Sequence, residues 1–168
     1  IGSTAAPYAA TLADRNDMRY VGVRHEQTAA AILDATGRLS GKPGCLMVHG
    51  ASGLLAASAG IASAALDSTP MFILSATQER RAMENGWWQT MNVQTPLRDV
   101  LKWQKRAERP DQVVEAVRRA LREAVSGKPG VAQVDLPIDV SADDLGDAVI
   151  PAPEPMATPR HRPHPDPQ

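Results

Sequence analysis

The chain has 168 residues, 43% of them hydrophobic, which suits one globular domain with a core of its own. Its 18 basic and 19 acidic residues give a net charge of −1 without a basic stripe, so neither nucleic acid nor an anionic membrane is expected as a partner. Cys45 is the only cysteine, which excludes an internal disulfide and a cysteine-based zinc site, and we predict that it is a small buried core residue. No apolar run reaches the roughly 20 residues that span a membrane, and we expect a cytoplasmic protein.

Apolar segments and helix-like segments alternate along the chain. The predicted strands are Tyr20–Val23, Cys45–Val48, Met71–Leu74, a short segment near Val100–Trp103, and Val131–Leu136. The predicted helices are Thr28–Leu39, an Ala/Leu-rich segment that ends near Leu66, and a segment that opens at Pro110 and ends before Gly127. Residues 78–95 are predicted to be a polar surface loop. This order predicts an α/β fold, with a doubly wound, mainly parallel sheet and helices on both faces.

Both ends of the chain suggest that further segments belong to it. Half of the 14 prolines lie between Pro151 and Pro167, a composition that favours an extended linker. The start, Ile1-Gly2-Ser3, has no signal-peptide pattern. We therefore predict one domain over residues 1–146, lacking its first strand and helix, and a linker over residues 147–168 towards a missing central domain.

Two titratable side chains lie where predicted strands lead into helices. Glu26 follows the strand at Tyr20–Val23, and His49 follows the strand at Cys45–Val48. Ligands of parallel α/β sheets bind beyond the carboxyl ends of the strands, so both positions suit a binding site. Simpler interpretations remain open: Glu26 could only stabilise a helix N-terminus, and His49 could be a structural imidazole. The glycine-rich segment that starts at His49 could be a tight turn.

Taken together, these segments resemble a known family. The stretch "RHEQTAA" from Arg24, "GIASAALDSTP" over Gly60–Pro70 and "SGKPGVAQVDLPIDV" over Ser126–Val140 follow in the order found in the pyrimidine-binding N-terminal domain of thiamine-diphosphate enzymes. The likeness is to acetolactate synthase and benzoylformate decarboxylase, over about Gly2 to Val140. It implies the thiamine-diphosphate-binding fold, which is a three-layer, Rossmann-like arrangement.

The resemblance also implies roles for individual residues. Glu26 would be the glutamate that bonds to the pyrimidine ring of thiamine diphosphate and activates the cofactor. His49 would be the acid/base that transfers protons, and Ser3 would bind the carboxylate of a 2-oxo acid. These three are the expected catalytic residues. The remaining expected contacts are Gly2, Ser52 and Gly53 with the cofactor, and Trp88 and Gln89, together with Ser3 and His49, with the substrate.

Within the family the motifs favour a decarboxylase. "VHGASG" around His49 and "SATQERRAM" over Ser75–Met83 resemble benzoylformate decarboxylase. Acetolactate synthases usually have Gly-Pro-Gly where this chain has Ala51-Ser52-Gly53. The predicted function is therefore the pyrimidine-binding half-site of a 2-oxo acid decarboxylase. An acetolactate synthase-like carboligase is the alternative.

The family binds the diphosphate and Mg²⁺ on a different domain, through a Gly-Asp-Gly motif that this chain does not contain. The resemblance therefore implies that the diphosphate-binding domain of a partner subunit completes the site. A homodimer or homotetramer is expected, and the isolated chain is expected to be inactive.

Two functions of other classes are also compatible with parts of the sequence. "MVHGASG" before an alanine-rich helix is similar to the phosphate turn of dinucleotide-binding oxidoreductases. However, the full Gly-x-Gly-x-x-Gly pattern is absent, and so is an acidic residue at the end of the Met71–Leu74 strand. A non-catalytic scaffold domain is the second alternative, although neither Glu26 nor His49 is needed to fill a core.

Overall fold

The computed structural model describes residues 2–146, so the predicted linker over residues 147–168 lies outside the described part of the chain. Four parallel strands form one sheet in the order β1-β2-β4-β3. The strands are β1 (Gly44–His49), β2 (Met71–Thr77), β3 (Trp103–Arg106) and β4 (Val131–Pro137). The helices are α1 (Ala6–Ala13), α2 (Glu26–Ser40), α3 (Ser52–Leu66), α4 (Arg80–Glu84), α5 (Pro110–Val125) and α6 (Ile138–Ala142).

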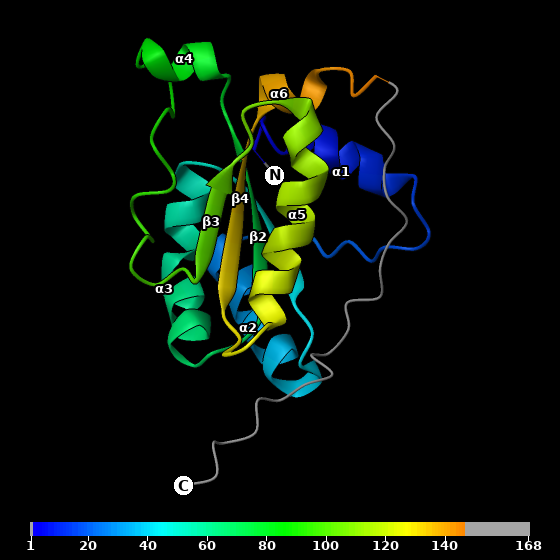
Figure 1. The fold of residues 1–168 in the computed structure, drawn as a ribbon, viewed down its shortest axis with the longest axis vertical. Coiled ribbons are helices and arrows are strands. Elements are labelled where there is room, and N and C mark those ends of the chain that lie inside the picture. Colours follow the sequence, from blue (N-terminus) through cyan, green and yellow to red (C-terminus); the bar gives the residue numbers. More distant parts are fainter. Residues whose placement is uncertain (1, 147–168) are drawn as a thin grey trace, which may run out of the picture.

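Helices cover both faces of this sheet, which confirms the predicted α/β fold class (Figure 1). On one face α2 and α3 enclose a core that includes Leu54 and Ile61. On the other face the alanines of α5 pack against Phe72 and Val134. The two central strands, β2 and β4, are therefore buried on both sides, as their apolar sequences predict.

The helices α2 and α3 approach each other closely through a glycine. A Cβ placed on Gly60 would lie 2.7 Å from the Cβ of Ala30, a distance at which one helix would have to move. Gly60 N–H also donates to Gln27 Oε1 at 3.3 Å, so the same contact ties α3 to the first turn of α2. Small residues at this crossing set where the N-terminus of α2, and therefore Glu26, lies against α3.

The predicted strand at Tyr20–Val23 is wrong, because this segment is irregular and exposed except for half-buried Val23. A strand needs a neighbour for its backbone hydrogen bonds. In the described sheet β1 is one of the two edge strands, and its one recorded partner is β2. Tyr20 and Val21 have strand-forming side chains, but within the described residues they have no strand to pair with.

Other sequence predictions need smaller corrections. The loop predicted over residues 78–95 contains the short helix α4. The strand predicted near Val100–Trp103 begins only at Trp103 and runs to Arg106. Cys45 is exposed on the edge strand β1 rather than buried in the core, because the side chains of a strand alternate between its two faces and α2 and α3 cover the other one.

Candidate functional site

The candidate site is built on the carboxyl ends of β1 and β2, which lie side by side. His49 ends β1 and is opposite Ala76 of β2 in the parallel register. Its side chain is only 6% exposed, so the ring sits inside the domain and not on its surface. This is the edge at which ligands bind in parallel α/β sheets.

Thr4 connects His49 to the neighbouring strand. Its Oγ1 lies 2.5 Å from His49 Nδ1 and donates a hydrogen bond to the carbonyl oxygen of Ala76 at 2.6 Å. Thr4 itself is 1% exposed, so both bonds are shielded from water. The other ring nitrogen of His49, Nε2, is buried and has no hydrogen-bond partner among the described residues. A buried polar nitrogen without a protein partner calls for an explanation, and a hydrogen bond from a ligand or an ordered water would provide one.

Gly2 packs against the same histidine. A Cβ on Gly2 would lie 2.8 Å from His49 Cβ and 2.9 Å from Cγ, closer than two such atoms can come. The carbonyl oxygen of Gly2 accepts from the N–H groups of Ala5 and Ala6, both at 3.1 Å, and so holds the turn that leads into α1. The structure thus places Gly2 as a packing partner of His49, while its predicted contact with a cofactor stays a prediction.

Glu26 is the first residue of α2 and is half-buried. Its neighbour His25 caps the helix, because His25 Nδ1 accepts from the N–H of Gln27 at 3.2 Å. A Cβ on Gly53 would lie 3.3 Å from Glu26 Oε1 and 3.4 Å from Val48 Cβ. The carboxylate of Glu26 therefore lies beside the first turn of α3, and Gly53 leaves space for it there.

The other predicted site residues lie at different distances from this centre. The ring of Trp88 is tilted against that of His49, with 6.1 Å between the centroids, although Trp88 is 68% exposed. Gln89 follows with a left-handed backbone, φ 55°. Ser52 opens α3 and is exposed, and Ser3 is exposed in the turn before α1. The roles predicted for these side chains stay predictions.

Thr4 is the residue of this site that the sequence does not reveal. The signal in the sequence is the hydroxyl pair Ser3-Thr4 after Gly2, in which the family resemblance assigns a role only to Ser3. Which of the two hydroxyls turns inwards depends on the turn that Gly2 starts and on residues 45 and 72 positions further along the chain. Separations of that length cannot be read from a local motif.

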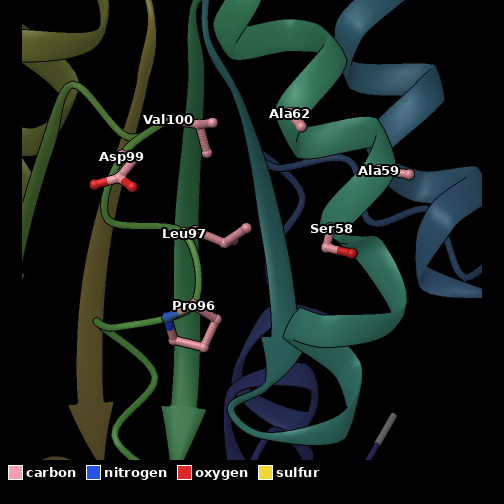
Figure 2. A pocket seen from close by; sticks show the side chains of 7 residues that line it. All are labelled: Ser58, Ala59, Ala62, Pro96, Leu97, Asp99 and Val100. Atoms are coloured by element: carbon pink, nitrogen blue, oxygen red, sulfur yellow. The ribbon is translucent and has the colours of Figure 1, made fainter.

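Two hollows lie outside this centre. The first has a volume of about 310 Å³ and lies between α3 and residues 96–100; Figure 2 shows its lining by Ser58, Ala59, Ala62, Pro96, Leu97, Asp99 and Val100. The second, of about 530 Å³, is polar and lies around α4 and Arg106. Neither is lined by Glu26 or His49.

Two kinds of feature are not found among the described residues. Within residues 2–146, no three or more His, Cys, Asp and Glu side chains are grouped so that they could hold a metal ion. No helix in that part of the chain has the length and apolar character needed to cross a membrane.

Comparisons with known proteins point to one family. Residues 1–97 match the family described as "Thiamine pyrophosphate enzyme, N-terminal TPP binding domain". Oxalyl-CoA decarboxylase of Escherichia coli (strain K12) is 32% identical over 132 residues, which are 77% of this chain and 23% of the relative. The probable acetolactate synthase large subunit of Methanocaldococcus jannaschii is 28% identical over 162 residues, 96% of this chain and 27% of the relative.

A third relative is 2-hydroxyacyl-CoA lyase 1 of Homo sapiens, which is 28% identical over 130 residues, 77% of this chain and 22% of the relative. The chain thus spans about a quarter of the length of each of these curated relatives. The family match, over residues 1–97, covers the segment from the turn at Gly2 through β1 and α3, where the candidate site lies.

Proposed function

Since the chain belongs to the thiamine pyrophosphate enzymes, we propose that it provides the pyrimidine-binding half of the active site of a larger 2-oxo acid decarboxylase. The observation that carries the proposal is the carboxylate of Glu26 beside Gly53, next to a strand end where His49 keeps a buried Nε2 without a partner among the described residues. The arrangement offers one carboxylate and one ring nitrogen to a ligand.

These residues fit the pyrimidine portion of thiamine diphosphate. A side chain at position 53 would crowd Glu26 Oε1, and the glycine keeps that space open. When bound, thiamine diphosphate supplies a nucleophilic carbon that adds to a carbonyl group and accepts the charge left when carbon dioxide departs. Glu26 would hold the pyrimidine through a hydrogen bond to a ring nitrogen. Mg²⁺ and the diphosphate would be held by another domain, since the described residues group no set of metal ligands.

The other residues of the site would act on the substrate. His49 would exchange a proton with a bound 2-oxo acid through Nε2, a step for which imidazole is suited near neutral pH. Ser3, one residue before Thr4, would bind the substrate carboxylate. Trp88 and Gln89 would contribute to the substrate pocket. The position of the Trp88 ring beside the ring of His49 supports this. The diphosphate-binding domain of a partner subunit, in a homodimer or homotetramer, would close the site.

The test uses the complete protein that carries this chain. Carbon dioxide release is measured from benzoylformate, pyruvate and oxalyl-CoA, with and without thiamine diphosphate and Mg²⁺. Oxalyl-CoA is included because a relative bears the name oxalyl-CoA decarboxylase, and an oxalyl group carries a carboxylate on a carbonyl carbon. Cofactor-dependent release supports the proposal. If the protein binds a nicotinamide cofactor but does not bind thiamine diphosphate, the proposal is overturned in favour of an oxidoreductase.

Glu26→Gln tests the role of the carboxylate. We expect turnover to fall by about 100-fold or more, because an amide cannot exchange a proton with the pyrimidine, while the assembly stays intact. Glu115→Gln on α5 is the matched control, since its exposed pair with Arg122 contributes little to stability. Unchanged turnover in the Glu26→Gln enzyme would support a scaffold role instead.

A carboligase of the acetolactate synthase type is the second candidate. It is favoured by the 28% identity to the probable acetolactate synthase large subunit of Methanocaldococcus jannaschii, which extends over 96% of this chain. The likeness to benzoylformate decarboxylase is a prediction from motifs, and the relatives described above bear other names. Analysis of the products from pyruvate distinguishes the two reactions, since a decarboxylase releases the aldehyde and a carboligase joins it to a second carbonyl compound.

A further inference from the structure

We infer that Thr4 is a positioning residue that fixes the tautomer of His49, holding the proton on Nδ1 and leaving Nε2 as the unprotonated nitrogen. Its importance for turnover rests on the proposed function, whereas the tautomer itself is a property of the folded chain.

The two contacts of Thr4 Oγ1 determine which ring nitrogen of His49 carries the proton. A threonine hydroxyl has one proton to donate and lone pairs to accept with. The oxygen of Ala76 is a backbone carbonyl, so it can only accept, and the hydroxyl proton is used in that bond at 2.6 Å. The remaining contact, Thr4 Oγ1 to His49 Nδ1 at 2.5 Å, must then have its proton on the nitrogen. A neutral His49 that carries its proton on Nδ1 has none on Nε2.

The surroundings hold this arrangement in place. The carbonyl oxygen of Ala76 also accepts from the N–H of Gly50 at 2.8 Å, so β2 and the turn after β1 fix the acceptor towards which Thr4 points. Gly2 packs against the Cβ, Cγ and Nδ1 atoms of His49. Thr4 and His49 are both buried, at 1% and 6% exposure, so water does not compete for these bonds.

This geometry determines what His49 offers to a ligand. In its neutral form Nε2 is an acceptor, and it can take a proton from an O–H or N–H group of a bound substrate. Once it has done so, the imidazolium carries protons on both nitrogens, and the bond to Thr4 persists because Nδ1 remains the donor. Thr4 can therefore support both protonation states without turning its hydroxyl.

The first measurement is spectroscopic and does not require turnover. Solid-state NMR of the complete protein with ¹⁵N-labelled histidine, at a pH of about 8.5 where an ordinary imidazole is neutral, distinguishes a protonated from an unprotonated ring nitrogen. His49→Gln identifies the His49 signals by their loss. We expect the protonated signal at Nδ1 and the unprotonated one at Nε2. A proton on Nε2 in the wild-type protein would overturn the inference, whatever the activity.

The second measurement uses variants of Thr4. Thr4→Val keeps the shape but removes the acceptor, so we expect the proton to leave Nδ1 and turnover to fall by about tenfold. Thr4→Ser restores the hydroxyl and is expected to restore the Nδ1 proton together with most of the turnover. Thr11→Val is the control. Thr11 Oγ1 also donates to a backbone carbonyl, that of Pro7 at 3.0 Å, but this bond is exposed, lies within α1 and does not involve His49.

The outcomes separate this inference from the proposed function. If Thr4→Val leaves the His49 signals unchanged, Thr4 does not set the tautomer and the inference fails. If the tautomer changes as expected but no 2-oxo acid is decarboxylated by the wild-type protein, the inference about the tautomer stands and the proposed function fails.

Discussion

At the scale of single residues, the candidate site depends on the absence of a side chain at Gly2. The backbone of Gly2 touches the ring of His49 so closely that any Cβ would overlap with it, at 2.8 Å from His49 Cβ. We predict that Gly2→Ala displaces the imidazole and lowers turnover of the complete enzyme by at least about tenfold, a loss typical of a small shift in a catalytic group. The same steady-state assay of carbon dioxide release measures it.

Gly22→Ala is the matched control for this prediction. A Cβ on Gly22 would meet the side chain of Tyr20 at 3.7 Å, an ordinary van der Waals contact, so the substitution is expected to leave turnover near the wild-type value. Equal activity of Gly2→Ala and Gly22→Ala would show that the position of His49 does not matter for the reaction.

Which site residues could be predicted depends on whether their neighbours are local. Glu26 and His49 could be found because each follows an apolar segment and precedes a helix, a pattern contained within a few residues. Thr4 could not be found, since its partners are 45 and 72 residues away. Gly2 was expected as a cofactor contact, but its close packing against His49 could not be predicted for the same reason, since the two residues are far apart in the sequence.

At the scale of elements, β3 and β4 are joined by an ion pair between a partly buried arginine and a buried aspartate. Arg106 Nε donates to Asp135 Oδ2 at 2.6 Å, and Thr77 Oγ1 donates to Asp135 Oδ1 at 2.7 Å. Burial raises the pKa of Asp135 above its ordinary value of 3.8, even though Thr77 and Arg106 lower it. The carboxylate of Asp135 is completely buried, so water does not stabilise its negative charge and Arg106 is the cation that does.

We predict that Arg106→Gln destabilises the domain by about 3 kcal/mol at neutral pH, because it leaves a buried carboxylate without its cation. The loss of Arg106 raises the pKa of Asp135 further. A native pKa above the unfolded one means that folding favours the protonated form, so the cost of the substitution is small below pH 3.8 and grows as pH rises through the raised pKa. Thermal unfolding of the complete protein at several pH values measures this.

The control is Arg109→Gln, which removes an exposed pair with Asp111 and is expected to change the melting temperature little at any pH. A destabilisation by Arg106→Gln that is the same at pH 4 and pH 8 would contradict the account of Asp135, because the variant would then lose only packing.

The elements themselves were predictable where their sequence periodicity is strong. The helix α5 begins at Pro110 as expected, because its apolar residues recur at helical spacing and a proline is favoured in the first turn. The segment Tyr20–Val23 has the side chains of a strand but lacks a partner within the described residues, and pairing is a property of the sheet rather than of the segment. The short helix α4, of only 5 residues, is too brief to show a period.

At the scale of the whole molecule, large aromatic side chains are exposed near the candidate site. Trp87 and Trp88 are 66% and 68% exposed. The ring of Trp88 lies 6.1 Å from that of His49, between centroids, so this exposed aromatic side chain borders the candidate site. Large exposed aromatic side chains beside a site favour coverage by another protein surface, which agrees with the proposed diphosphate-binding domain.

The domain by itself is expected to be inactive. The chain spans about a quarter of the length of the relatives described above, and the proposed pyrimidine site is only part of the proposed active site. We predict that residues 1–168, expressed alone, release no carbon dioxide from benzoylformate, pyruvate or oxalyl-CoA at saturating thiamine diphosphate and Mg²⁺. Calorimetry should also show binding of the cofactor at least about 100-fold weaker than by the complete protein, because the diphosphate contacts are lost. Turnover by the isolated chain would mean that it contains the whole active site, and the partner domain would then have no place in the mechanism.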